Sequence, residues 1–404
     1  MGWDTSTSGA KRTGADGASM IYPGGKCHPV MAKYKSVVVD VNAWLRSVLP
    51  RSLGTDTTPL QATQRIFWSS LFKKKDADDK FSEQTMPDLQ YALFAFDDGA
   101  LLPEMRHIFH ASKRYKKAVA APRAHERRCP EDGRNYPRDE YPIDDDLIDS
   151  ITMTNMPGKW ICVWNNPRAK NKLWAVLVEC IKQVIREGVQ TNPHTIYIVD
   201  DNHGERWVHP VTDAADPNLV ENGMPPLWYG EADLKALHWG LYFDGCDVGP
   251  VAFATNDWDS VLTMLLHKAP IDIILGSVLV HDDEDGTPFV FDPLRVALRD
   301  PKKEWDCPGK RAFEIIHMDV LHTKYPEYDR RCELLMLLMC NGGVDYCDGL
   351  ARFGYSEKVV ESITDGFREG RTKPWITTLV DPDDPGRRSM EFNLGVFFDA
   401  LLLG

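Results

Sequence analysis

The sequence predicts an α/β protein whose central sheet is mostly parallel. Short apolar runs, typical of strands buried on both faces, alternate along the chain with segments of helical periodicity. The chain has 404 residues, which is enough for a large hydrophobic core. Because helices separate successive strands in this pattern, we expect the strands to pair in parallel.

The predicted strands are short runs rich in β-branched and aromatic residues. They begin at Ser36, Tyr91, Thr195, Val251 and Asp272. The predicted helices have apolar residues at helical spacing, and the first of them ends at a C-cap glycine, Gly188. They span residues 173–187, 231–240, 260–266, 331–340 and 357–367.

Composition divides the chain into four predicted parts. Residues 1–32 are rich in Gly, Ser and Pro and predict an irregular arm. The α/β core is expected over residues 33–309, with a basic segment at about 105–128 and an insertion at about 200–229. A helical region is expected over residues 310–370, followed by a C-terminal tail over 371–404.

The charge and the cysteines exclude several classes of protein. The chain has 47 basic and 60 acidic residues, a formal net charge of −13, which argues against a histone-like coat of positive charge. Its nine cysteines form no C-x-x-C pair, so neither a structural zinc site nor a disulfide framework is predicted. We find no signal-peptide pattern and no long apolar run, and therefore expect a soluble intracellular protein with no membrane partner.

Acidic residues recur where predicted strands end or helices begin. In a parallel sheet such positions meet at one edge, where ligands bind. The acids are Asp40, Asp97, Glu231, Asp233, Asp257, Asp259 and Asp345. Any one of them alone is more often a turn or N-cap residue than a ligand. Seven together would repel one another unless cations neutralise them, and ligation by oxygen alone favours two Mg²⁺ or Mn²⁺ ions. Such ions suit phosphodiester hydrolysis.

The order and context of these acids resemble the XPG/flap endonuclease family of PIN-like nucleases. Five motifs carry the resemblance, and together they extend over residues 33–367. They are V-V-V-D ending at Asp40, F-D-D-G with Asp97, G-E-A-D with Glu231 and Asp233, T-N-D-W-D-S with Asp257 and Asp259, and G-V-D-Y with Asp345. The resemblance implies a PIN-like sheet flanked by helices, a helical arch or clamp, and a C-terminal helix-two-turn-helix region.

The resemblance also implies a role for each residue. One metal ion would be held by Asp40, Asp97, Glu231 and Asp233, and the other by Asp257, Asp259 and Asp345, with Asp233 shared between them as an alternative. Positive charge on the scissile phosphate would come from Arg106 and Lys113, with Arg114 as a competitor for the second role. A solvated helix face remains the alternative for this basic segment.

Further residues are predicted to contact the nucleic acid. They are Lys116 and Lys117 in the basic segment, Trp44 as a base-stacking residue, and Arg352 and Gly354 in the duplex-binding turn. For Trp44, a place in the core is the equally weighted alternative. The C-terminal segment that includes Leu394, Phe397 and Phe398 resembles a sliding-clamp-binding box, with Glu391 in place of its Gln. Packing of these apolar residues onto the chain's own core is the favoured alternative.

We therefore expect a divalent-metal-dependent endonuclease or 5′ exonuclease that acts on DNA with a single-stranded flap or 5′ end, in replication, repair or recombination. A nucleus or another compartment that contains DNA is the expected location. An RNA-cleaving PIN-like nuclease is one alternative, because carboxylates that bind metal do not read the sugar. An inactive nucleic-acid-binding or scaffold protein on the same fold is the other. A comparison of flap DNA with its RNA equivalent would separate these hypotheses.

Overall fold

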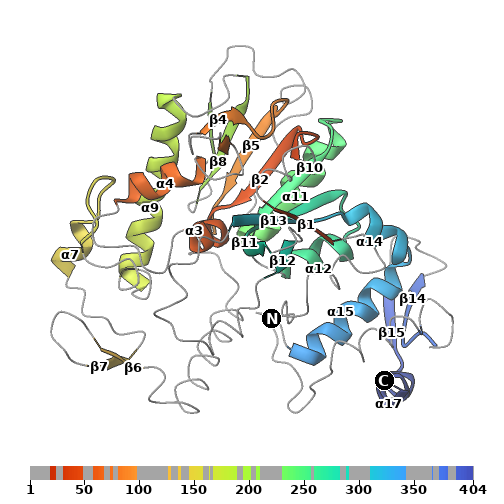
Figure 1. Ribbon diagram of the computed structural model, residues 1–404. Coiled ribbons are helices and arrows are strands. Elements are labelled where there is room, and N and C mark those ends of the chain that lie inside the picture. Colours follow the sequence, from red (N-terminus) through yellow and green to blue (C-terminus); the bar gives the residue numbers. More distant parts are fainter. Residues whose placement is uncertain are drawn as a thin grey trace. The chain divides into compact units, whose positions relative to one another are not determined.

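The computed structural model describes about half of the chain (Figure 1). The chain forms two compact units. The sheet unit comprises Thr5–Asp257 and Pro270–His317, and the C-terminal unit comprises Met1–Asp4, Trp258–Ala269 and Met318–Gly404. The described residues are 19–23, 31–48, 58–67, 73–75, 81–97, 126–128, 135–137, 145–157, 163, 167–188, 194–201, 206–209, 230–255, 259–282, 288–290, 310–342, 366, 373–380 and 388–403.

A nine-stranded sheet forms the centre of the sheet unit. Five of its strands are parallel and adjacent, and this confirms the predicted α/β class. In spatial order they are β11 (Ile271–Asp282), β10 (Val251–Thr255), β2 (Ser36–Asp40), β5 (Tyr91–Ala95) and β8 (Ile196–Asp200). From β2 the chain adds β5 and β8 on one side and then β10 and β11 on the other. The direction of addition therefore reverses between β2 and β10, which makes this boundary the topological switch point.

Antiparallel strands extend the sheet on both sides. Next to β8 lies β9 (Arg206–His209), and next to β11 lie β12 (Pro288–Val290) and β13 (Lys310–Ile316). The first strand of the chain, β1 (Ser19–Pro23), pairs with β13. An α/β sheet commonly carries such antiparallel strands at its edges.

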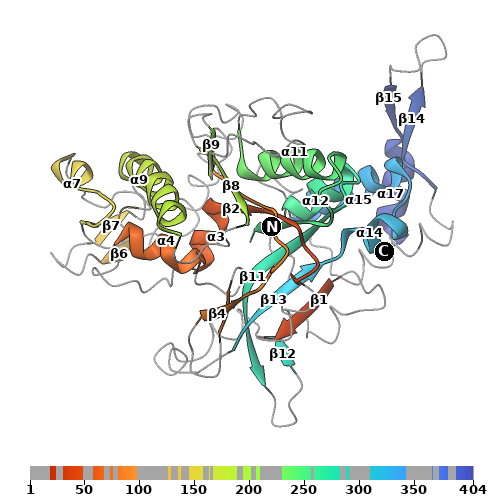
Figure 2. The same cartoon turned by 90° about the horizontal axis from the view of Figure 1, so that it is seen from above.

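Helices cover both faces of the parallel strands (Figure 2). On one face lies α11 (Ala232–Gly245), where Phe243 stacks on Tyr91 with ring centroids 5.1 Å apart. Gly240 allows α11 to approach the sheet closely, because a Cβ atom there would lie 2.2 Å from Cδ1 of Ile271. The other face carries the main hydrophobic core, which includes Val37 and Val39 of β2.

Three helices supply most of the remaining core on that second face. They are α3 (Val41–Val48), α4 (Pro59–Phe67) and α9 (Pro167–Glu187), and they contribute Trp44, Ala62 and Leu177 respectively. The short helix α7 (Asp145–Asp149) adds Ile148. The two-stranded hairpins of the unit are β3 (Lys73–Lys75) with β4 (Phe81–Gln84), and β6 (Glu126–Arg128) with β7 (Asn135–Pro137).

The C-terminal unit combines helices with a β-hairpin. Its helices are α12 (Asp259–Leu266), α14 (Met318–Lys324), α15 (Tyr328–Gly342) and α17 (Leu394–Leu403), and its hairpin pairs β14 (Ile376–Val380) with β15 (Arg388–Phe392). The buried Glu333 carboxylate accepts hydrogen bonds from the backbone N–H groups of Trp375 and Ile376, at 2.5 and 3.0 Å. Asp329 likewise accepts the N–H of Thr378, at 3.0 Å. These bonds from α15 occupy the outer edge of β14.

The structure differs from the sequence prediction in three places. Residues 19–23, expected in an irregular arm, form β1, because the short Met-Ile-Tyr segment finds its partner in β13, far away in the sequence. The expected helical region from 310 instead begins with β13, and helix formation starts at Met318. Within the expected insertion at 200–229, residues 206–209 form β9. Most of the basic segment at 105–128 lies outside the described residues.

Among the described residues, no helix is both long and apolar enough to cross a membrane.

Candidate carboxylate site at the switch point

Asp40 is the last residue of β2 and lies at the switch point. Its side chain is 6% exposed. Oδ1 accepts the backbone N–H of Ala43 at 2.9 Å, and so caps α3. Oδ2 accepts the hydroxyl of Thr255, the last residue of β10, at 3.2 Å. The carboxylate therefore joins the ends of the two strands on either side of the switch point.

Asp97 connects the end of β5 to the beginning of α11. It follows β5 by two residues, and its Oδ1 accepts the backbone N–H of Ala232, the first residue of α11, at 2.9 Å. A carboxylate at this position satisfies one of the donors left open at a helix N-terminus and interacts favourably with the helix dipole. The contact places Asp97 beside the two acids that open this helix.

Those two acids are Glu231 and Asp233. Glu231 is the N-cap residue of α11, has an extended backbone and is buried, although its side chain makes no capping hydrogen bond. Asp233 lies in the first turn and is half-buried, and its Oδ1 accepts the N–H of Leu234 at 2.8 Å. Three carboxylates therefore surround the first turn of α11, where the partial positive charge of the helix favours them.

Strand register places Asp40 on the same face of the sheet as these acids. Asp40 pairs with Ala95, and side chains alternate between the faces of a strand. Val37 and Val39 point into the core on the α9 side, so Asp40 faces α11. Asp97, two residues beyond Ala95, continues on the same side. The structure thus places Asp40, Asp97, Glu231 and Asp233 at the same edge of the sheet.

Sequence reasoning missed a further acid at this edge of the sheet, Asp200. It ends β8, pairs with Ala95 and is fully buried. Lys235 Nζ donates to Asp200 Oδ1 at 2.9 Å and to the backbone oxygen of Asp201 at 2.8 Å, and Trp239 Nε1 donates to Asp200 Oδ2 at 2.9 Å. The sequence gives the same indication for Asp200 as for Asp40, since Asp200 also ends an apolar strand. Its partner Lys235 lies one helical turn beyond Glu231 and is fully buried.

A second cation lies close to this pair. The Arg206 guanidinium stands over the Trp239 ring, 4.8 Å from its centroid. Burial lowers the pKa of Arg206, and the negative charge of Asp200 opposes that shift. The charge of Asp200 is therefore neutralised by the protein. Asp40, Asp97, Glu231 and Asp233 offer oxygen atoms alone, the ligand type that a hard divalent cation prefers. In this structure no three of these four described carboxylates bring an oxygen atom each within 4.8 Å of one another.

Most of the other predicted site residues lie outside the described part of the chain. They are Asp257, Asp345, Arg106, Lys113, Arg114, Lys116, Lys117, Arg352 and Gly354. Asp259 is the first residue of α12 in the C-terminal unit. The structure does not describe the side chain of Asp259 or that of Phe398. Their roles stay predictions.

Trp44 requires a correction. It is 1% exposed and belongs to the main hydrophobic core. A ring without accessible surface is not a platform on which a nucleic-acid base can stack. The apolar face of the short helix α3 turns Trp44 toward the sheet, so the core alternative fits the structure and the stacking role is withdrawn.

The C-terminal box is divided between buried and exposed residues. Phe397, on α17, is 3% exposed, and its ring centroid lies 5.6 Å from those of both Trp375 and Phe392. Leu394, at the start of the same helix, is 54% exposed. One aromatic residue of the box therefore packs within the C-terminal unit, while the leading aliphatic residue faces solvent.

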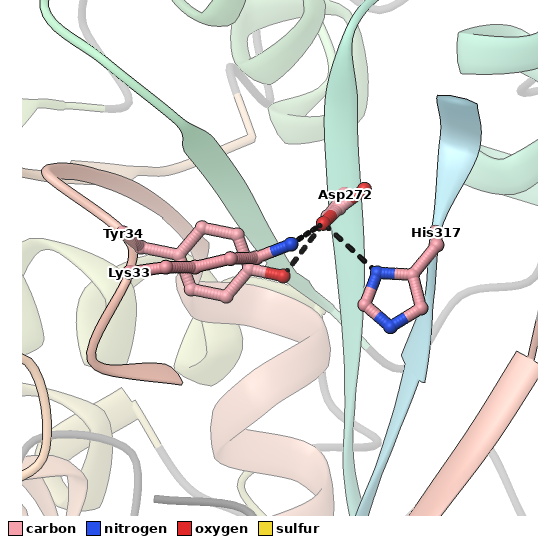
Figure 3. A network of polar contacts seen from close by, with 4 residues as sticks. All are labelled: Lys33, Tyr34, Asp272 and His317. Atoms are coloured by element: carbon pink, nitrogen blue, oxygen red, sulfur yellow. Dashed lines mark hydrogen bonds and ion pairs between the residues drawn. The ribbon is translucent and has the colours of Figure 1, made fainter. Parts of the chain in front are cut away.

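A different network lies at the opposite end of the parallel strands (Figure 3). Asp272, the second residue of β11, receives Lys33 Nζ and Tyr34 Oη on its Oδ2, each at 2.7 Å, and His317 Nδ1 lies 3.2 Å from the same oxygen. Burial raises the pKa of Asp272, but hydrogen bonds from His317, Lys33 and Tyr34 outweigh it and hold the pKa below its usual range. This network ties β11, β13 and the segment before β2 together.

No protein-family model matches the chain, and no curated protein matches it.

Proposed function

We propose that this chain is a divalent-metal-dependent nuclease of the PIN-like, XPG/flap endonuclease kind, which hydrolyses phosphodiester bonds in flap or branched DNA. The observation that carries the proposal is the position of Asp40, Asp97, Glu231 and Asp233. These four carboxylates lie at the end of β2, just after β5 and at the beginning of α11, and share the face and edge where ligands bind in a parallel α/β sheet.

The donor set supports Mg²⁺ or Mn²⁺ as the cofactor. All four candidate ligands at this edge are carboxylates. Carboxylate ligands without nitrogen or sulfur partners favour hard cations. When bound, such an ion would polarise the phosphodiester and lower the pKa of a bound water. The protein's own contribution is to hold the carboxylates, through the bonds from Ala43, Thr255 and Ala232.

The remaining motifs resemble those of the XPG/flap endonuclease family, and they supply the other residues of the proposed site. Asp257, Asp259 and Asp345 would hold a second ion, and Arg106 with Lys113 would place positive charge on the reacting phosphate. A flap or a free 5′ end of DNA would be the substrate, and the C-terminal box would be a contact for a sliding clamp.

The test is cleavage of a 5′-flap DNA labelled at its flap, with Mg²⁺ and with EDTA, beside an RNA of the same structure. We expect cleavage of the DNA with Mg²⁺ and none with EDTA. Asp97→Asn should lower the rate by about a hundredfold or more. Asp88→Asn, which changes an exposed acid just before β5, is the matched control and should cleave like the wild type.

The alternatives give different results in the same assay. Preferred cleavage of the RNA would establish the RNA-cleaving alternative. Binding of either strand without cleavage, by a folded wild-type protein at saturating Mg²⁺, would favour the inactive binding protein. Activity of Asp97→Asn within tenfold of the wild type would contradict the assignment of this carboxylate.

A further inference from the structure

The buried pair Asp200 and Lys235 lies beside the carboxylate site without belonging to its donor set. Both side chains have no exposed surface, and their charged atoms are 2.9 Å apart. Both carboxylate oxygens of Asp200 are occupied from α11, one by Lys235 and the other by Trp239, which is one helical turn further on. Asp200 thus fastens two consecutive turns of α11 to the end of β8.

The same helix presents two of the four acids of the site. The backbone N–H of Lys235 donates to the carbonyl of Glu231 at 3.0 Å, within the first turn. A shift of Lys235 along the helix axis would therefore move Glu231 and Asp233 relative to Asp40, which ends β2, and Asp97, which follows β5 by two residues. The geometry of the donor set depends on where α11 is fastened.

The apolar contacts of α11 fix its position along the sheet less well than the polar contacts of Lys235 do. The stacking of Phe243 on Tyr91 and the close approach at Gly240 set the distance between the helix and the sheet. Apolar contact is non-directional, however, and tolerates sliding, whereas Lys235 has two acceptors in fixed places, Asp200 and the backbone oxygen of Asp201. Taking an ion pair out of water costs more than burying apolar residues of the same size. The buried pair is thus better explained by its effect on the position of α11 than by a contribution to the stability of the fold.

We propose that Lys235 is a positioning residue of the carboxylate site: through Asp200 it holds the first turn of α11 in register with the ends of β2 and β5. It also neutralises Asp200, which would otherwise add a bare carboxylate to the row of strand ends. The proposal deepens the proposed function and rests on it for the identity of the bound ion.

The test uses the full chain with the double substitution Asp200→Asn and Lys235→Met. This variant removes both charges, keeps an oxygen acceptor for Trp239 and avoids the unpaired buried charge that either single substitution would leave. The matched control is Glu179→Gln with Lys182→Met, which neutralises an ion pair of 2.9 Å on α9 of the same unit. Each protein is examined for thermal unfolding, for binding of Mn²⁺ alone, and for hydrogen exchange of the Ala232 and Leu234 amides.

We expect the double variant to melt within a few degrees of the wild type and to bind Mn²⁺ about 10–100-fold more weakly, as is usual when the support of a metal ligand is removed. The Ala232 and Leu234 amides should exchange faster, while the control stays unchanged. Unchanged Mn²⁺ affinity and unchanged exchange in a stably folded double variant would overturn the proposal.

The outcome also separates this proposal from the proposed function. If the wild type binds no Mn²⁺, the metal-dependent function fails, and amide exchange alone decides on positioning. Faster exchange at Ala232 and Leu234 then supports it, and exchange at the wild-type rate overturns it.

Discussion

The hydroxyl of Thr255 donates a hydrogen bond to Asp40 across the switch point of the sheet, at 3.2 Å. Both residues are buried, and each is the last residue of its strand. The bond therefore fixes the orientation of a carboxylate at the place where a parallel α/β sheet binds its ligand.

Thr255→Val should test the strength of this relationship, because it removes the hydroxyl and keeps the shape of the side chain. A hydrogen bond to a charged acceptor contributes about 1.5–3 kcal/mol, so the free energy of unfolding should fall by about that amount. Urea denaturation measures it. The control is Thr195→Val, which removes a buried hydroxyl bound to the neutral carbonyl of Leu89 at 2.6 Å. Equal losses in the two variants would show that the charge of Asp40 plays no part.

Divalent cations should stabilise the folded chain, because Asp40, Asp97, Glu231 and Asp233 repel one another less when an ion lies between them. A ligand that binds only the folded state stabilises it by about 2.7 kcal/mol at 100 times its Kd. Titration with Mg²⁺ should therefore raise the melting temperature, and EDTA should reverse the change. Asp97→Asn should reduce the rise, whereas Asp88→Asn should keep it. A rise of the same size in both variants would indicate that Mg²⁺ acts elsewhere.

Much of the sheet could be predicted from local sequence. Ser36–Asp40 and Tyr91–Ala95 are apolar runs closed by a polar or acidic segment, and each forms a strand close to its expected bounds. The edge of the sheet could be predicted as well, because strands that are parallel bring their carboxyl ends together. The pairing of Ser19–Pro23 with β13 could not, since it joins segments almost 300 residues apart in sequence and neither carries a distinctive pattern.

The candidate site could be predicted only in part. Asp200 also ends an apolar strand, as Asp40 does, but the family resemblance assigns no role to this position. Lys235 has the composition of a surface residue, since lysine is almost never fully buried unless it is paired. Its burial follows from Asp200, and only the three-dimensional contact of α11 with β8 brings the two together.

Asp272 should make the stability of the sheet unit depend on pH in the acid range. Its pKa is lower in the folded chain than in the unfolded one, so its contribution is complete above about pH 4 and is lost as the pH falls toward the folded-state value. Asp272→Asn should lower the unfolding free energy at neutral pH by about 1.5–3 kcal/mol. The gap between wild type and variant should then close on acidification.

Urea denaturation at a series of pH values measures this gap. Asp146→Asn, which changes an exposed acid on α7, is the control and should follow the wild type at every pH. A gap between wild type and Asp272→Asn that stays constant from neutral to acid pH would show that the charge of Asp272 is not what the three donors stabilise.

Phe397→Ala should destabilise the C-terminal unit, because Phe397 packs between Trp375 and Phe392 with almost no exposed surface. Truncation of a buried phenylalanine costs about 3–5 kcal/mol, which a melting curve shows as a drop of several degrees. Leu394→Ala, on the same helix but at an exposed position, should change stability by less than about 0.5 kcal/mol.

The two variants also test the clamp hypothesis, since Phe397 and Leu394 both belong to the box. A sliding clamp that binds the wild type and loses affinity with Leu394→Ala at an unchanged melting temperature would establish a docking role for the exposed part of the box. Loss of stability with Phe397→Ala, together with no measurable affinity of the wild type for a clamp, would assign the box to the core of the C-terminal unit.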